Sequence, residues 1–146
     1  ARLICKSRLY IVASPEYLAE HGHPRHSHEL NTHQTIGFSR PVYLNTWPLK
    51  VVEEYYSIEP KITASSGETV RQLALSGHGI ARLSEFEIWQ DLQAGRLVAL
   101  FEDQIERQLQ HIHAVYYQQK HLPNRIRLFI DFLADELKDQ FSTPDE

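Results

Sequence analysis

The chain has 146 residues, of which 42% are hydrophobic and 23% charged, a composition typical of a folded domain with a buried core. Its formal net charge of −4 lacks the basic excess that holds nucleic-acid phosphates, so we expect no specific DNA binding by this chain alone. The single cysteine, Cys5, excludes an internal disulfide and fits the cytoplasm, and no apolar run approaches the roughly 20 residues of a membrane span.

Short apolar runs, helix caps and turn residues predict an alternation of strands and helices along the chain. Ser14 followed by Pro15, for example, is a helix-start signal, because Ser caps helices and Pro suits the first helical position. The predicted elements, in chain order, are a strand at 8–14, a helix at 15–21, a polar loop at 23–33 with one turn capped by Ser27, a strand at 34–38, irregular strands at 42–47 and 50–56, a strand at 61–66, a helix at 67–77, a strand at 79–84, a helix at 84–95, strands at 96–101 and 111–119, and a helix from about 123.

The clearest pattern lies between residues 61 and 101, where strands and helices alternate regularly. Ser84 and Glu87 have the spacing of a capping box, and Gly95 is placed to end the helix that they begin. This alternation is typical of α/β units around a mostly parallel sheet. In the last predicted helix one face is apolar, formed by Ile126, Phe129, Ile130, Leu133 and Leu137.

Five of the nine histidines lie in residues 21–33, "HGHPRHSHELNTH", which raises the question of a metal site. Zinc needs three or four converging ligands, and neither an HExxH motif nor a second Cys or Asp cluster accompanies this loop. The plainer interpretation is a solvated polar loop, which we favour.

The stretch "TASSGETV", residues 63–70, places two serines and a glycine between a predicted strand and a predicted helix. Free backbone N–H groups and the helix dipole make such a helix start a place where an anion can bind. In open α/β sheets, ligands also bind beyond the carboxyl ends of strands. The alternative is an ordinary N-cap, formed by Ser65 or Ser66, with nothing bound; caps are the commoner of the two.

No motif of the chain indicates catalysis. A GxSxG elbow is missing, and nothing around Cys5 marks it as an activated nucleophile. "SGHGIA", residues 76–81, follows a helix and precedes a strand, which is the wrong order for a dinucleotide fingerprint. We therefore expect neither an enzyme nor a cofactor.

Taken together, four stretches in their order and spacing resemble the effector-binding domain of LysR-type transcriptional regulators. The stretches are "RLYIVASPEYLAEHGHP" (8–24), "ELNTHQTIGFS" (29–39), "ASSGETVRQLALSGHGIARLSEFEIWQDLQAGRLVALF" (64–101) and "HAVYYQQKHLPNRIRLFIDFL" (113–133). The resemblance implies that residues 21–33 are a turn between two elements. His23, His26 and His28 would then lie on a variable surface loop and need no metal.

The resemblance also implies an α/β fold of the type 2 periplasmic-binding-protein kind, a mixed sheet with helices on both faces. Residues 1–13 would be a crossover strand and the remnant of a first regulatory lobe. Residues 14–97 would be the second lobe, and residues 98–146 would return to the first lobe. Because family members begin with a helix-turn-helix DNA reader that this chain lacks, we expect the chain to be a fragment of a longer protein.

By the same resemblance, a small and often anionic effector would bind where strands end. The residues expected to bind it are Ser14, Phe38, Ser39, Ser65, Ser66 and Gly67. The implied partners are the effector, further copies of the same chain in a homo-oligomer, and DNA, the last only through the helix-turn-helix domain. No membrane partner is expected.

Two other functions stay open. A similar two-lobed fold binds nutrients in the periplasm as a solute-binding receptor, and the residues encoded before Ala1 would separate the two: a basic helix-turn-helix for the regulator, a signal peptide for the receptor. A metal-dependent enzyme remains only if the histidine loop binds zinc tightly.

Overall fold

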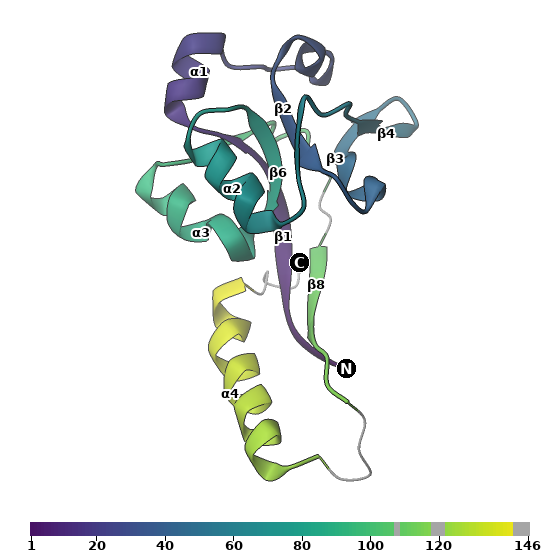
Figure 1. Ribbon diagram of the computed structural model, residues 1–146, viewed down its shortest axis with the longest axis vertical. Coiled ribbons are helices and arrows are strands. Elements are labelled where there is room, and N and C mark those ends of the chain that lie inside the picture. Colours follow the sequence, from purple (N-terminus) through teal and green to yellow (C-terminus); the bar gives the residue numbers. More distant parts are fainter. Residues whose placement is uncertain (107–108, 118–121, 142–146) are drawn as a thin grey trace. The chain divides into compact units, whose positions relative to one another are not determined.

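The computed structural model describes residues 1–106, 109–117 and 122–141 (Figure 1). The chain forms two compact units. The larger unit spans Leu9–Gln108, and the smaller unit combines Ala1–Arg8 with Leu109–Glu146. Among the described residues, no helix is both long and apolar enough to cross a membrane.

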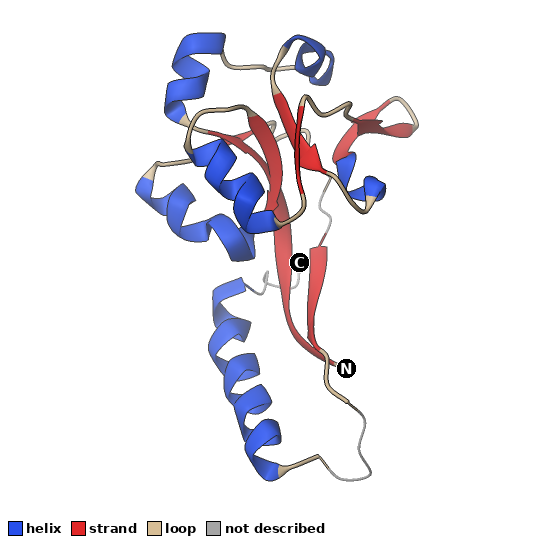
Figure 2. Cartoon of the chain, in the orientation of Figure 1, coloured by secondary structure: helices blue, strands red, loops and turns tan. Residues whose placement is uncertain are grey.

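Strands and helices alternate along the described chain, as Figure 2 shows. They are β1 (Arg2–Ala13), α1 (Pro15–His21), the 3₁₀ helix η1 (Ser27–Thr32), β2 (Thr35–Phe38), the 3₁₀ helix η2 (Val42–Asn45), β3 (Thr46–Val51), β4 (Glu54–Ser57), β5 (Ile62–Ala64), α2 (Gly67–Leu75), β6 (Ile80–Ser84), α3 (Glu85–Ala94), β7 (Val98–Leu100), β8 (Leu109–Ala114) and α4 (Asn124–Phe141).

The sheet of the larger unit has the strand order β5-β2-β6-β1-β7. Strand β2 is parallel to both β5 and β6, whereas β1 is antiparallel to β6 and to β7. The strands β5, β2, β6 and β7 therefore all run one way, and β1 alone runs against them. The predicted mixed sheet is confirmed: two of its four neighbouring strand pairs are parallel and two are antiparallel. Helices α2 and α3 are the crossover connections between strands that run the same way.

Helices pack on both faces of this sheet, as predicted. On one face, α2 and α3 contribute Val70, Ala74 and Ile88 to a core that has no solvent exposure at these positions. On the other face, α1 and β3 contribute the buried Tyr17 and Trp47. Full burial of one such large apolar side chain stabilises the fold by about 1.5–3 kcal/mol, so each face adds substantially to stability.

Local sequence signals located the helix ends well. The hydroxyl of Ser14 accepts the Tyr17 N–H at 3.1 Å, and α1 has its predicted bounds. The capping box of Ser84 and Glu87 is present, and Gly95 ends α3 in the left-handed conformation, with φ of 74°.

Several stretches differ from the prediction. The strand expected at 8–14 begins already at Arg2, and the strand expected at 50–56 is interrupted by a turn between β3 and β4. Residues 42–45, expected as strand, form the 3₁₀ helix η2, because Pro41 fixes its start and the Asn45 side chain bonds to another strand. Ser27 lies inside η1, whose N-cap is His26. The last strand, expected at 111–119, is observed as β8 at Leu109–Ala114; residues 118 and 119 lie outside the described residues.

In the smaller unit, the first half of β1 pairs with β8, from Arg2 opposite Ala114 to Arg8 opposite Leu109. Arg2 also forms an ion pair with Asp131 of α4.

The two units divide the chain after residues 8 and 108, while the sequence suggested divisions after 13 and 97. The difference arises because the second half of β1 and all of β7 pair within the sheet of the larger unit. The assignment of these segments to two regulatory lobes stays a prediction.

A buried carboxylate joins the two crossover helices. Asp91 of α3 is fully buried and accepts two hydrogen bonds from Arg71 of α2, at 2.7 and 3.1 Å, and one from Arg96 at 2.9 Å. Burial opposes ionisation of Asp91, but the hydrogen bonds and charges of the two arginines outweigh burial and hold its pKa below the ordinary value.

We predict that Asp91→Asn lowers the free energy of unfolding by roughly 3 kcal/mol, because it removes the anion from a buried ion pair. Urea unfolding measures the loss, and Asp103→Asn, at an exposed position, is the control. Since the native pKa of Asp91 is lowered, its contribution is complete above the unfolded pKa of about 3.9 and disappears as pH falls through the native value. Equal stability of the two variants would contradict the prediction.

Candidate functional site

The structure brings five of the six predicted binding residues to one edge of the sheet. This carboxyl edge is where β2, β5 and β6 end. The N–H of Ser39 donates to the carbonyl of Ala64 at 2.9 Å, which joins the end of β2 to the end of β5. Ser65, Ser66 and Gly67 follow immediately and open helix α2.

Ser66 is the N-cap of α2. Its hydroxyl accepts the N–H of Thr69 at 3.2 Å and lies 3.0 Å from the Thr69 hydroxyl. Ser66 thus satisfies one of the free N–H groups at this helix start. The side chains of Ser39 and Ser65 are exposed and have no hydrogen-bond partner among the described residues. They are the freest hydroxyl groups of the edge.

Gly67 makes room for a carboxylate. A Cβ atom at this position would lie 2.0 Å from Oε1 of Glu87, so only glycine allows the present position of the Glu87 side chain. Glu87 also accepts the Ser84 N–H at 3.4 Å. Removal of water from the Glu87 carboxyl raises its pKa. A protein anion therefore already lies at the start of α2, close to where a ligand anion was expected.

Phe38 and Asn45 fix the end of β2. The Asn45 side chain accepts the Phe38 N–H at 2.8 Å and donates to the Phe38 carbonyl at 2.9 Å, in place of a neighbouring strand. The Phe38 ring is half-buried against the core beside α2 and α3. The sequence did not indicate Asn45, because nothing local in "VYLN" shows which backbone its side chain will meet.

Ser14 does not join the other five residues. Because β1 runs against β2, β5 and β6, its last residues lie at the edge where those strands begin. Ser14 is 2% exposed and caps α1, and a Cβ at Gly77, just before β6, would lie 3.5 Å from its hydroxyl. Its inclusion in one site with Ser65 and Ser66 was therefore wrong: the alternating pattern reveals a strand but not its direction.

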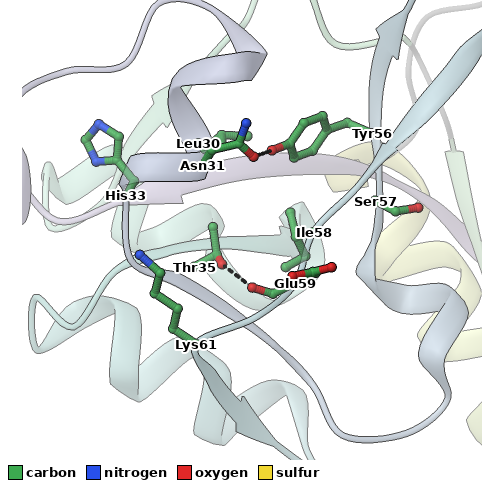
Figure 3. Close-up of a pocket in the computed structure, with 9 residues that line it drawn as sticks. All are labelled: Leu30, Asn31, His33, Thr35, Tyr56, Ser57, Ile58, Glu59 and Lys61. Carbon is green, nitrogen blue, oxygen red and sulfur yellow. Dashed lines mark hydrogen bonds between the residues drawn. The ribbon is translucent and has the colours of Figure 1, made fainter.

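This second edge carries a hollow of about 370 Å³ (Figure 3). Most of its polar groups bond to the protein itself: the Tyr56 hydroxyl donates to Oδ1 of Asn31 at 2.6 Å, and the Thr35 hydroxyl donates to the Glu59 carbonyl at 3.4 Å. The hydroxyl groups of Tyr56 and Thr35 are therefore already engaged within the protein. The residues lining the hollow are Leu30, Asn31, His33, Thr35, Tyr56, Ser57, Ile58, Glu59 and Lys61.

His33, at this hollow, is part of a buried hydrogen-bond chain. The Tyr17 hydroxyl accepts the Gln34 N–H at 3.0 Å and lies 2.8 Å from Nδ1 of His33. Burial, together with the charge of His21, lowers the pKa of His33, which favours the neutral imidazole at neutral pH. This histidine has a structural partner.

The other histidines of the loop contact aromatic rings or solvent. His21 stacks on Tyr17 with ring centroids 4.4 Å apart, and His26 stacks on His28 at 5.6 Å. His23, His26 and His28 are exposed, as the surface-loop interpretation predicted. No group of three or more metal-ligating side chains converges among the residues that the structure describes.

Residues 1–138 match the model of the LysR substrate binding domain. The HTH-type transcriptional regulator CrgA of Neisseria meningitidis is 46% identical over 138 residues, which is 94% of this chain and 46% of CrgA. The transcriptional activator TtdR of Escherichia coli is 30% identical over 149 residues, 100% of this chain and 47% of TtdR. The chain thus spans about half the length of these relatives.

Solved structures agree with these sequence matches. The CrgA regulatory domain from Neisseria meningitidis superposes with a TM-score of 0.89 at 45% identity, over 94% of this chain and 68% of that domain. Full-length AphB, the Vibrio cholerae virulence activator, superposes with a TM-score of 0.72 at 29% identity, over 92% of this chain and 46% of AphB.

We predict that Gly67→Ala moves the Glu87 carboxyl into solvent, because the new Cβ would overlap Oε1. The pKa of Glu87, raised in the native protein, should then fall toward its ordinary value. Carbon-detected NMR titration of the Glu87 carboxyl measures the change. The control variant Ser76→Ala, at the other end of α2, should leave the titration midpoint of Glu87 unchanged. If the midpoint of Glu87 is also unchanged in Gly67→Ala, the Glu87 carboxyl is not held beside Gly67.

Proposed function

The chain belongs to the LysR substrate-binding domain family, and from this membership we propose that it senses a small anionic metabolite at the carboxyl edge of its sheet. The observation that carries the proposal is the family match over residues 1–138, combined with the exposed serine hydroxyls beside the start of α2. The proposed contacts are Ser39, Ser65, Ser66 and Gly67, with Phe38 against the apolar part of the ligand.

A regulator is favoured over a solute-binding receptor by the relatives. CrgA and TtdR are named as HTH-type transcriptional regulators, and this chain covers about half of each. We infer that binding of the metabolite acts on a helix-turn-helix domain joined to this one, in the cytoplasm, and that this chain catalyses no reaction. The acidic net charge of −4 supports DNA contact through that other domain.

The start of α2 alone would bind a ligand weakly. An exposed anion gains roughly 0.3–1 kcal/mol from a helix dipole, whereas even millimolar binding requires about 4 kcal/mol. Glu87 and Glu68 add negative charge near this helix start, which works against an anion. Further contacts are therefore needed for useful affinity.

We predict that Ser65→Ala combined with Ser66→Ala weakens the effector response of a regulator that carries this chain behind its helix-turn-helix domain, while promoter binding persists. The reason is loss of two hydroxyl groups at the binding edge. A reporter dose–response with the inducing metabolite measures the effect, gel retardation measures promoter binding, and Ser27→Ala in η1 is the control. An unchanged dose–response in the double variant would show that the start of α2 is not part of the effector site.

We also propose that the chain self-associates through the smaller unit. Val115 and Tyr117 are 85% and 93% exposed, and α4 presents the exposed side chains of Leu128, Phe129 and Phe132. Apolar groups gathered on one short unit favour association with a partner surface.

Sedimentation velocity should show concentration-dependent association of this chain. Phe129→Asp combined with Phe132→Asp should return it to monomer, because two charges replace apolar contact area. Glu136→Gln, at an exposed position of the same helix, should associate like the native chain. A native chain that stays monomeric at high concentration would contradict the proposal.

A further inference from the structure

The hydroxyl of Tyr17 and the ring of His33 form a buried pair where helix α1 meets the start of β2. The two residues are 1% and 8% exposed, and the hydroxyl lies 2.8 Å from Nδ1 of His33. The same hydroxyl accepts the N–H of Gln34 at 3.0 Å, and the Gln34 carbonyl accepts the N–H of Ile80 at 2.8 Å. The pair therefore joins α1 to the starts of two neighbouring strands, β2 and β6.

The hydrogen bonds of this pair determine where its protons lie. The Tyr17 oxygen accepts the Gln34 N–H, and among the described residues Nδ1 of His33 is the remaining hydrogen-bond partner of that hydroxyl. A buried hydroxyl needs an acceptor for its own hydrogen. We therefore assign the Tyr17 hydroxyl as the donor to Nδ1, which places the single ring proton of neutral His33 on Nε2.

Protonation of His33 is incompatible with this arrangement. An imidazolium carries hydrogens on both nitrogens, so Nδ1 would change from an acceptor into a donor. The Tyr17 oxygen would then face two N–H donors, from His33 and from Gln34, while its own hydrogen would lose its acceptor. Both an unpaired buried donor and a buried charge are unfavourable, so protonation favours separation of the pair.

The surroundings of His33 keep it neutral until the solution is mildly acidic. Burial disfavours a positive charge on His33 most strongly, and the charges of His21 in α1 and Lys61 before β5 act in the same direction. Glu29 of η1 opposes them. The pKa of His33 is therefore lowered from its ordinary value of about 6.5. The other titratable side chains of the hollow, Tyr56 and Glu59, lie on its far side from His33 (Figure 3).

We propose that Tyr17 and His33 form a pH switch, which fixes the connection from η1 to β2 at neutral pH and loosens it when His33 is protonated. That connection is residues 31–34. Asn31 and His33 line the hollow of about 370 Å³, so the shape of the hollow would change with pH. The inference goes beyond the proposed function and does not rest on it, because neither residue belongs to the carboxyl edge.

The test measures hydrogen exchange of the Gln34 amide in this chain by NMR, in a pH series across the histidine range, with each rate divided by the intrinsic rate at that pH. The protection of Gln34 should fall by about tenfold or more in acid, because its N–H loses a fixed acceptor. The fall should have the same midpoint as the titration of the His33 ring signals. The amide of Val70, which donates to the Ser66 carbonyl in α2, should keep its protection.

Two variants test the two members of the pair. His33→Asn keeps an acceptor near the position of Nδ1 but takes up no proton, so Gln34 should stay protected throughout the pH series. Tyr17→Phe keeps the buried ring but removes the hydroxyl, so the protection of Gln34 should be low at every pH. His28→Asn, at an exposed position of η1, is the matched control and should keep the native pH dependence. The amide signals of α2 and β6 show whether each variant is folded.

Several results would overturn the proposal. If Gln34 stays protected while the His33 ring titrates, the connection tolerates an imidazolium. A Gln34 midpoint that differs from the His33 midpoint contradicts the switch without the use of any variant. If His33→Asn loses protection in acid as the native chain does, another group, such as the neighbouring His21, is the sensor. If Val70 loses protection together with Gln34, the chain unfolds as a whole and the switch is wrong.

Discussion

The ion pair of Asp91 with Arg71 and Arg96 fixes the arrangement of the two crossover helices on which the carboxyl edge of the larger unit depends. Asp91 lies on α3 and Arg71 on α2, so the buried charge sets the position of one crossover helix against the other. The contact between Gly67 at the start of α2 and Glu87 in the first turn of α3 depends on that position. The geometry of the carboxyl edge is therefore determined by a charge cluster farther along the same two helices.

The carboxyl edge contains both signs of charge in a small space. Glu87 places a carboxylate at the start of α2, and Arg82 places an incompletely bonded guanidinium on the adjoining strand. An anion held by the helix start alone would meet the carboxylate of Glu87, which opposes the favourable dipole of α2. Useful affinity for an anion at this edge therefore needs contacts besides the helix start.

Much of the architecture could be predicted from the sequence, since its signals are local. Ser14–Pro15, the Ser84–Glu87 box and Gly95 each act within a few residues, and the helices that they delimit are present. The direction of β1 could not be predicted, because the order and sense of strands are decided by tertiary pairing. For the same reason, the sequence could not show that Ser14 lies away from the other predicted site residues. It also could not show that Gly67 is needed to make room for Glu87. The bond of Arg82 to the Leu44 carbonyl and the contact of Glu87 with Gly67 likewise join residues that are distant in the chain.

At the carboxyl edge, the side chains that cap and pack the helix start are different from the side chains that face solvent. Ser66, Gly67 and Glu87 maintain the helix start, while the side chains of Ser39 and Ser65 bond to no other described residue. Substitutions at Ser39 and Ser65 therefore alter the surface offered to a ligand at little expense in stability. The two serines can therefore be exchanged for larger or charged residues as chemical probes of this edge while the helix start beneath them keeps its cap.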